Sequence, residues 1–104
     1  SSNIKEMRFP AGKLEMHFDL VDGFICNLKI YGDFLDDGDL SGLLNILNGT
    51  RYDIESIDKT LNGIDISKII LNITKEQFLT CMFINWIFKN ITLILRWIFN
   101  IIST

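Results

Sequence analysis

The sequence has few of the residues that build metal sites and phosphate-binding loops. It contains one histidine and two cysteines, Cys26 and Cys81, which lie far apart in the chain. A zinc site therefore has too few closely spaced ligands to form. The seven glycines are dispersed and no two are adjacent, so the sequence offers no glycine-rich loop that would cradle a phosphate before a helix. We expect no metal, and no cofactor bound by this chain alone.

Positive charge is also scarce. The 104 residues include 10 Lys and Arg against 13 Asp and Glu, a net charge of -3. Nucleic-acid binding favours a basic face that displaces counterions from phosphates, so we expect no nucleic-acid partner. No apolar segment follows a basic patch at the N-terminus, so no secretory signal is expected. Two cysteines in apolar settings are typical of reduced core thiols in a cytoplasmic protein. The opening Ser1-Ser2-Asn3 is expected to be a cloning remnant.

Apolar and polar residues alternate early in the chain, which predicts strands with one face in solvent. Over 13–20 the apolar face comprises Leu14, Met16, Phe18 and Leu20, and the polar face Lys13, Glu15, His17 and Asp19. No nucleophile is indicated beside His17, so we predict no catalytic residue. Asp22-Gly23 predicts a turn, and residues 4–9 an edge strand closed by Pro10. The second hairpin strand is expected to place on its apolar side Phe24, Cys26, Leu28 and Ile30.

From Asp33 onward the apolar residues recur at helical spacing. Asp39 is expected to cap a first helix after a loop at 36–38, and this helix continues to Gly49. Asp53 is expected to cap a second, short helix. Residues 64–73 are ambiguous between an irregular turn and a short strand. Thr74 with Gln77 matches a capping box that opens a third helix, with Phe78, Cys81 and Met82 facing inward. Strands followed by helices predict an α+β fold, a small antiparallel sheet with one face covered by helices.

Residues 84–104 form a distinct apolar segment. At about 100° per residue its polar residues fall mainly in one stripe, so it predicts an amphipathic helix. The residues of this polar stripe are Asn85, Lys89, Thr92, Arg96 and Asn100. In a membrane Lys89 and Arg96 would cost about 2.5 to 3.5 kcal/mol each, which offsets the apolar gain. We expect self-association through 84–102 rather than a membrane span. Three alternatives remain open. The helix packs against its own domain or an absent partner domain, it lies in a membrane interface, or it is non-native sequence appended to a truncated module.

Five short motifs follow one another along the chain. They are Arg8-Phe9-Pro10-Ala11-Gly12, the turn at Asp22-Gly23, Ile30-Tyr31-Gly32-Asp33-Phe34, Gly49-Thr50-Arg51-Tyr52 and Ile73-Thr74-Lys75-Glu76. Their order and spacing over 4–83 resemble the C-terminal accessory domain of the bacterial lipoate-protein ligases. In that family ATP is used to adenylate lipoate, and the lipoyl group then passes to a lysine of an acceptor domain. The resemblance implies that this chemistry belongs to a separate catalytic domain, whose glycine-rich loop and catalytic lysine motif are not found in this sequence.

The resemblance implies a gating and docking role. The module would close over the lipoyl-adenylate site and help present the acceptor domain, so its partners would be a catalytic lipoate-ligase domain, on the same or a separate chain, and a lipoyl acceptor domain. Residues in the shared motifs would form the docking surface: Arg8, Phe9, Gly32, Asp33, Phe34, Arg51 and Tyr52. The alternative is a non-catalytic interaction or scaffold module, since the predicted fold also resembles iron-sulfur assembly proteins of the SufE/NifU type. We take Cys26 on an apolar strand face as evidence against that alternative.

Overall fold

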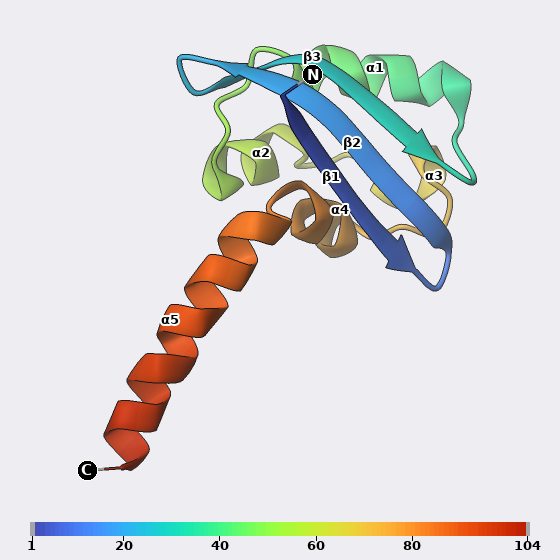
Figure 1. Cartoon of the computed structure of the whole chain (residues 1–104). Helices are drawn as coiled ribbons and strands as arrows, with labels where there is room; N and C mark the ends of the chain where they lie inside the picture. The colour runs from blue at the N-terminus through green and yellow to red at the C-terminus, as the bar shows by residue number, and fades with distance from the viewer. Residues whose placement is uncertain (1, 104) are drawn as a thin grey trace.

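A computed structural model describes residues 2–103, apart from the side chain of Asp37. Within them a three-stranded antiparallel sheet in the order β1-β2-β3 precedes five helices (Figure 1). The strands are β1 (Asn3–Phe9), β2 (Gly12–Val21) and β3 (Phe24–Gly32). The helices are α1 (Asp37–Leu47), α2 (Ile54–Thr60), α3 (Ile66–Ile69), α4 (Lys75–Met82) and α5 (Ile84–Ile102). The predicted α+β fold is confirmed; the likeness to SufE/NifU proteins stays a prediction.

The core lies between the sheet and the helices α1 to α4, which cover one face (Figure 1). α1 packs against β3, and α4 packs against β1 and β2. As predicted, Leu14, Met16 and Phe18 of β2 are fully buried. Leu20 is 37% exposed, so its predicted place in the core is wrong. The reason is that β1 pairs with β2 only as far as Phe18. The last residues of β2, Leu20 among them, therefore have no β1 strand beside them.

A β-bulge in β3 reverses the predicted alternation of its first half. Cys26 opposes Asp19 while Lys29 opposes His17, so β3 holds one extra residue at this point. Asn27 accommodates it with a positive φ of 53°, a conformation that asparagine tolerates better than most residues. The bulge turns Ile25 inward. The predicted burial of Phe24 and Cys26 is therefore wrong: Phe24 is exposed and Cys26 is half-buried.

The first helix begins earlier than predicted. Its cap is Asp36, whose carboxylate accepts from the backbone N–H groups of Gly38 and Asp39, so Asp39 is not the cap. The reason lies in the preceding residues: Leu35 forms a bridge with Ile70, and the Asp36 N–H donates to the Ile69 carbonyl at 2.8 Å. This pairing holds the chain extended up to Asp36, which makes Asp36 the first residue able to cap.

The later caps agree with the sequence. Asp53 caps α2 by accepting from the Ser56 N–H, and Thr74 and Gln77 form both bonds of the predicted capping box. The inward residues of α4, Phe78, Cys81 and Met82, are fully buried. The ambiguous stretch 64–73 is neither a plain turn nor a strand, because it holds the short helix α3 and then the bridge at Ile70.

The C-terminal segment is a helix, as predicted, but it does not pack along its own domain. α5 projects from the body of the protein (Figure 1), and none of its described residues is buried. The chain bends by 86° between α4 and α5. Among residues 2–103 no single helix is long and apolar enough to cross a membrane, although α4 and α5 pass that test together as a bent pair.

The first residues take part in the fold where they are described. Ser1 and Thr104 lie outside the described residues. The Ser2 N–H donates to the Asp19 carboxylate at 2.8 Å, and Asn3 begins β1, opposite Phe18. The interpretation of 1–3 as a cloning remnant stays a prediction.

Candidate functional site

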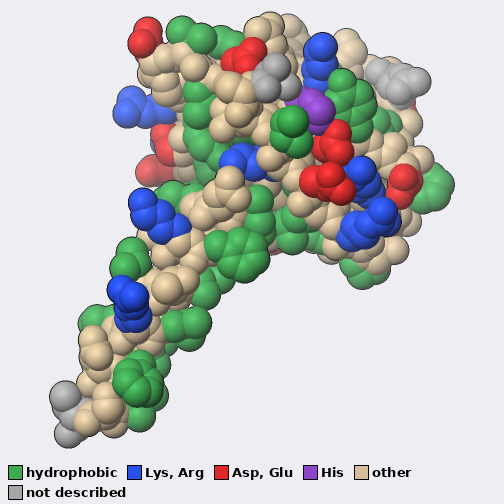
Figure 2. Space-filling model, in the orientation of Figure 1, with side chains coloured by type: hydrophobic (Ala, Val, Ile, Leu, Met, Phe, Trp, Pro, Cys, Tyr) green, Lys and Arg blue, Asp and Glu red, His purple; other side chains and the backbone are tan. Residues whose placement is uncertain are grey.

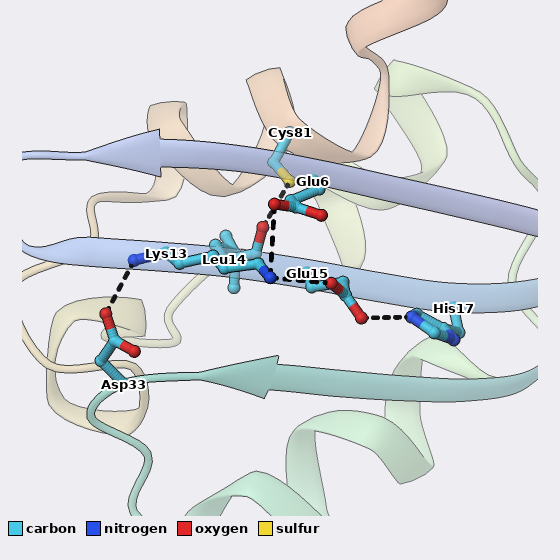
Figure 3. A network of polar contacts seen from close by, with 7 residues as sticks. All are labelled: Glu6, Lys13, Leu14, Glu15, His17, Asp33 and Cys81. Carbon is cyan, nitrogen blue, oxygen red and sulfur yellow. Dashed lines mark hydrogen bonds and ion pairs between the residues drawn. The ribbon is translucent and has the colours of Figure 1, made fainter.

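Two of the short motifs meet at one end of the sheet, where β1 and β3 end and β2 begins (Figure 3). The Asp33 carboxylate accepts from the Lys13 N–H at 3.0 Å. Gly12 has a φ of +138°, and a Cβ placed on it would lie 2.5 Å from Asp33 Oδ2. Only glycine leaves room there for the carboxylate. The Arg-Phe-x-x-Gly and Gly-Asp-Phe motifs therefore form one structural lock, in which Asp33 ties the end of β3 to the start of β2.

This lock holds an aromatic side chain out into solvent. Phe34 follows Asp33 directly and is 57% exposed. Its carbonyl accepts from the Leu71 N–H at 3.0 Å, and the next residue, Leu35, forms the bridge with Ile70. Phe34 is thus held by the Asp33 carboxylate contact before it and by the backbone pairing at Phe34 and Leu35. A rigidly mounted, exposed aromatic side chain is typical of a protein contact.

A groove runs beside Phe34. Its volume is about 570 Å³, and Leu71, also exposed, adds a second apolar side chain to it. Lys68 adds a positive charge. We call this the Phe34 groove; it is lined by Asp33, Phe34, Leu35, Asp36, Lys68 and Leu71. Lys68 and Leu71 come from the stretch whose structure the sequence left ambiguous, and nothing in the run Ile69-Ile70-Leu71 indicates which residue faces outward.

The other predicted docking residues at this end differ in exposure. Arg8 is exposed at the end of β1, opposite Lys13 in the register. Phe9 is partly buried and packs against the core. Gly32 lies inside the sheet edge, where a Cβ would lie 3.2 Å from the Lys13 carbonyl oxygen. Arg8 and Phe34 can therefore reach a partner, whereas Phe9 and Gly32 support the structure beneath them.

Arg51 and Tyr52 lie at the opposite end of the sheet. Arg51 bridges Phe24, and the Tyr52 N–H donates to the carbonyl of Gly23 in the β2–β3 turn at 2.8 Å. β2 alone separates the two ends by about 30 Å at 3.3 Å per residue. The predicted docking set is thus divided between two ends of the molecule, and the structure does not bring its members together.

Tyr52 is used inside the fold. Its ring stacks on Phe83 with centroids 4.6 Å apart and leans on Phe18. Its hydroxyl donates to the Met82 carbonyl at 2.8 Å, and burial raises the pKa of this phenol above its usual value. Tyr52 therefore anchors the junction of α4 and α5. Arg51 stays exposed, with its Nε 3.4 Å from an Asp53 carboxylate oxygen.

The same junction forms a second hollow, of about 450 Å³, which the sequence did not indicate. Its apolar lining includes Tyr52, Phe83 and Trp86, and Glu55 and Asp58 add carboxylates. Asp58 is paired with Lys75 at 2.5 Å. The lining residues come from two separate stretches of sequence, 52–58 and 83–86, so only the fold shows that they adjoin.

The outer face of the sheet carries a ladder of charges (Figure 3). Lys13 Nζ lies 3.3 Å from carboxylate oxygens of both Glu6 and Glu15, and His17 Nε2 lies 2.5 Å from Glu15 Oε2. Hydrogen bonds from His17 and then Lys13 hold the pKa of Glu15 below its usual value. The His17 ring also meets Tyr31 edge-on at 5.0 Å. Glu6 and Glu15 lie directly opposite each other in the register, and Lys13 between them offsets the repulsion of these two like charges.

The two cysteines lie in different surroundings. Cys81 is fully buried, and its Sγ lies 3.7 Å from the Leu14 carbonyl oxygen. Burial raises the pKa of this thiol to about 11. Cys26 is half-buried, so the argument that an apolar strand face conceals it is wrong. Among the side chains that the structure describes, no three of His, Cys, Asp or Glu lie close enough together to hold a metal ion.

Comparison with known proteins gives consistent matches. The family described as "Bacterial lipoate protein ligase C-terminus" matches residues 2–82. "Lipoate-protein ligase LplJ" of Bacillus subtilis is 37% identical over 76 residues, which are 73% of this chain and 23% of the relative. A "Lipoate--protein ligase" of Streptococcus pyogenes is 37% identical over 73 residues, 70% of this chain and 22% of the relative. "Lipoate--protein ligase 1" of Staphylococcus aureus is 32% identical over 78 residues, 75% and 24% respectively. The chain thus spans about a quarter of the length of these relatives.

Proposed function

Since this chain belongs to the family of bacterial lipoate protein ligase C-terminal domains, we propose that it is the accessory domain that docks on and gates a catalytic lipoate-ligase domain. The catalytic domain, on the same or a separate chain, would adenylate lipoate with ATP and release pyrophosphate. It would then transfer the lipoyl group to a lysine of an acceptor domain. This chain would close over the lipoyl-adenylate site and help to present the acceptor.

The observation that carries the docking role is the rigid exposure of Phe34. A side chain that is 57% exposed on a backbone fixed by Asp33 and by the Leu71 N–H loses little freedom when it binds. Such preorganisation lowers the entropic cost of association. The groove beside it offers a further apolar contact at Leu71, and Lys68 with the Asp33 and Asp36 carboxylates adds charges of both signs for polar contacts with the partner.

The structure refines which predicted residues we assign to this surface. We retain Arg8 and Phe34 as contact residues and add Lys68 and Leu71. Asp33 and Gly32 act by holding Phe34 in place. Arg51 pairs with Phe24 at the far end of the sheet, so we do not assign it to this surface. Tyr52 acts within the fold through its bond to Met82.

The proposal is tested by complementation. The Bacillus subtilis relative, shortened so that it lacks the segment aligned with this chain, is mixed with this chain, ATP and lipoate, and pyrophosphate release is measured. Neither the shortened relative nor this chain alone is expected to give full turnover, and the mixture is expected to restore it. Phe34→Ala should weaken the rescue about tenfold, the effect of losing roughly 1.4 kcal/mol of contact.

Phe24→Ala is the matched control. Phe24 is also an exposed phenylalanine on the sheet, at 43%, but it lies at the opposite end, beside Arg51. Rescue should be unchanged in this variant. Pyrophosphate release by this chain alone, abolished by changing one of its own residues, would contradict the accessory role. Rescue equally sensitive to both phenylalanines would remove the Phe34 groove as the contact.

A further inference from the structure

The projecting helix α5 carries a continuous seam of isoleucine. Six isoleucines recur at alternating intervals of three and four residues: Ile84, Ile87, Ile91, Ile94, Ile98 and Ile101. This interval averages 3.5 residues, the repeat that keeps one stripe of a helix facing neighbouring helices. The seam covers almost the whole helix, which is about 28 Å long at 1.5 Å per residue.

Most of this seam faces solvent in the single chain. Ile87 is partly buried against the core, whereas Ile91, Ile94 and Ile98 are exposed. The polar stripe of Lys89, Arg96 and their neighbours lies on the opposite side of the helix at about 100° per residue. Figure 2 shows the basic side chains of the projecting helix along one edge, with hydrophobic side chains beside them and along the other edge.

We propose that the α5 helices of three or more copies of this chain pack together along the isoleucine seam. In the heptad notation the six isoleucines occupy every a and d position. Isoleucine at both positions favours three or four strands over two. The seam is less than three heptads long, so a bundle in which each helix meets two neighbours gives more burial per chain than a pair.

The residues beside the seam also fit a bundle of several helices. Phe88, Leu95 and Ile102 occupy the e positions, and Trp97 occupies a g position. They widen the apolar face beyond what one partner helix covers. Lys89 and Arg96 fall at the f positions, which point furthest from the bundle axis, so like charges of different copies stay apart. α5 contains no acidic residue that would pair with them.

The isoleucines favour copies of this chain over a lipid surface as the occupant. A lipid surface accepts any apolar residue, whereas six of the seven isoleucines of α5 occupy the a and d positions that a helical bundle needs. The 86° bend directs α5 away from the sheet. The Phe34 groove lies at the end of the sheet remote from Tyr52 and Phe83, where α5 begins, so a bundle leaves that groove accessible.

The test is the mass of the full chain in solution, by sedimentation equilibrium. The wild type is expected at three or more times the chain mass of 12.0 kDa, with helical circular dichroism that rises with concentration. Ile94→Asp should reduce the mass to that of one chain at the same concentration. The sheet and α1 to α4 remain intact in this variant, because Ile94 does not contribute to the core.

Leu93→Asp is the matched control. Leu93 and Ile94 are adjacent and equally exposed, at 54% each, but Leu93 lies off the seam. This variant should keep the wild-type mass. A single-chain mass for the wild type would overturn the proposal, whether or not it then binds vesicles of neutral and anionic phospholipid. Equal loss of association in the two variants would overturn it as well, because association would then depend on general apolarity.

Discussion

At the scale of single residues, the close contact between Gly12 and Asp33 holds together the end of the sheet that carries Phe34. Gly12→Ala should destabilise the protein by about 1 to 3 kcal/mol, because alanine at a positive φ is strained and its Cβ would lie 2.5 Å from Asp33 Oδ2. Urea unfolding measures the loss. In an Asp33→Ala background the penalty of Gly12→Ala should shrink, since the obstructing carboxylate is gone.

Gly42→Ala provides the control for that substitution. Gly42 lies inside α1, and a Cβ there meets nothing within 4 Å. Alanine should stabilise the protein by about 0.5 to 1 kcal/mol, the difference in helix propensity. A loss of stability at Gly42, or none at Gly12, would contradict this description of the two sites. The lock also means that Asp33→Ala should cost stability, so Phe34→Ala is the cleaner probe of docking.

The two thiols should react at different rates. In the folded chain Cys26 should react with a thiol reagent at neutral pH, while Cys81 should stay protected until the protein unfolds. The reason is that Cys81 is buried and its pKa is raised to about 11, and only the thiolate is nucleophilic. Labelling with and without urea, read by mass spectrometry, separates the two. Fast labelling of Cys81 in the native state would show that the α4 packing is wrong.

The bulge at Asn27 could not be predicted from the alternation of apolar and polar residues. Simple alternation predicts burial of Cys26, and the structure buries Ile25. The departure depends on a single left-handed residue and on long-range bonds such as the Leu28 N–H to Asn48 Oδ1, at 2.9 Å. A period-two pattern contains no information on a bond between residues twenty positions apart.

At the scale of elements, the cap of α2 is sensitive to acid. Hydrogen bonds from the Ser56 backbone and hydroxyl hold the pKa of Asp53 below its ordinary 3.8. A carboxyl group whose pKa is lowered on folding stabilises the fold above its ordinary pKa, and this contribution is lost as the pH falls through the folded value. The Asp53 cap should therefore weaken below about pH 4.

Asp53→Asn isolates this titration, because asparagine caps helices well and carries no charge. The stability of the wild type relative to this variant should fall as the pH is lowered from about 6 to 3. Thermal unfolding at each pH provides the measurement. A constant difference between the two proteins across this range would show that the Asp53 carboxylate gains nothing from its bonds on folding.

The sequence predicts elements best where the signal is local. The capping box of Thr74 and Gln77 and the cap at Asp53 need only three or four neighbouring residues, and both are confirmed. The start of α1 is wrong by three residues, because the bridge of Leu35 to Ile70 decides which aspartate caps. α3 escapes prediction for a related reason: four residues are too few to show a helical period.

At the scale of the whole molecule, the family match ends where the chain bends between α4 and α5. The match ends at residue 82, next to Phe83, where the chain bends into α5. The motif order predicts the family correctly, but it does not show that Arg8 and Phe34 lie at one end of the sheet and Arg51 at the other. That separation follows from strand register, which the motifs do not encode.

The account of docking rests on one contact, and calorimetric titration tests it most directly. The shortened Bacillus subtilis relative, without the segment aligned with this chain, is titrated with the wild type, Phe34→Ala and Phe24→Ala. We predict saturable binding of the wild type, binding about tenfold weaker for Phe34→Ala, and unchanged binding for Phe24→Ala. No binding of a folded wild type, or the same affinity for all three proteins, would contradict it.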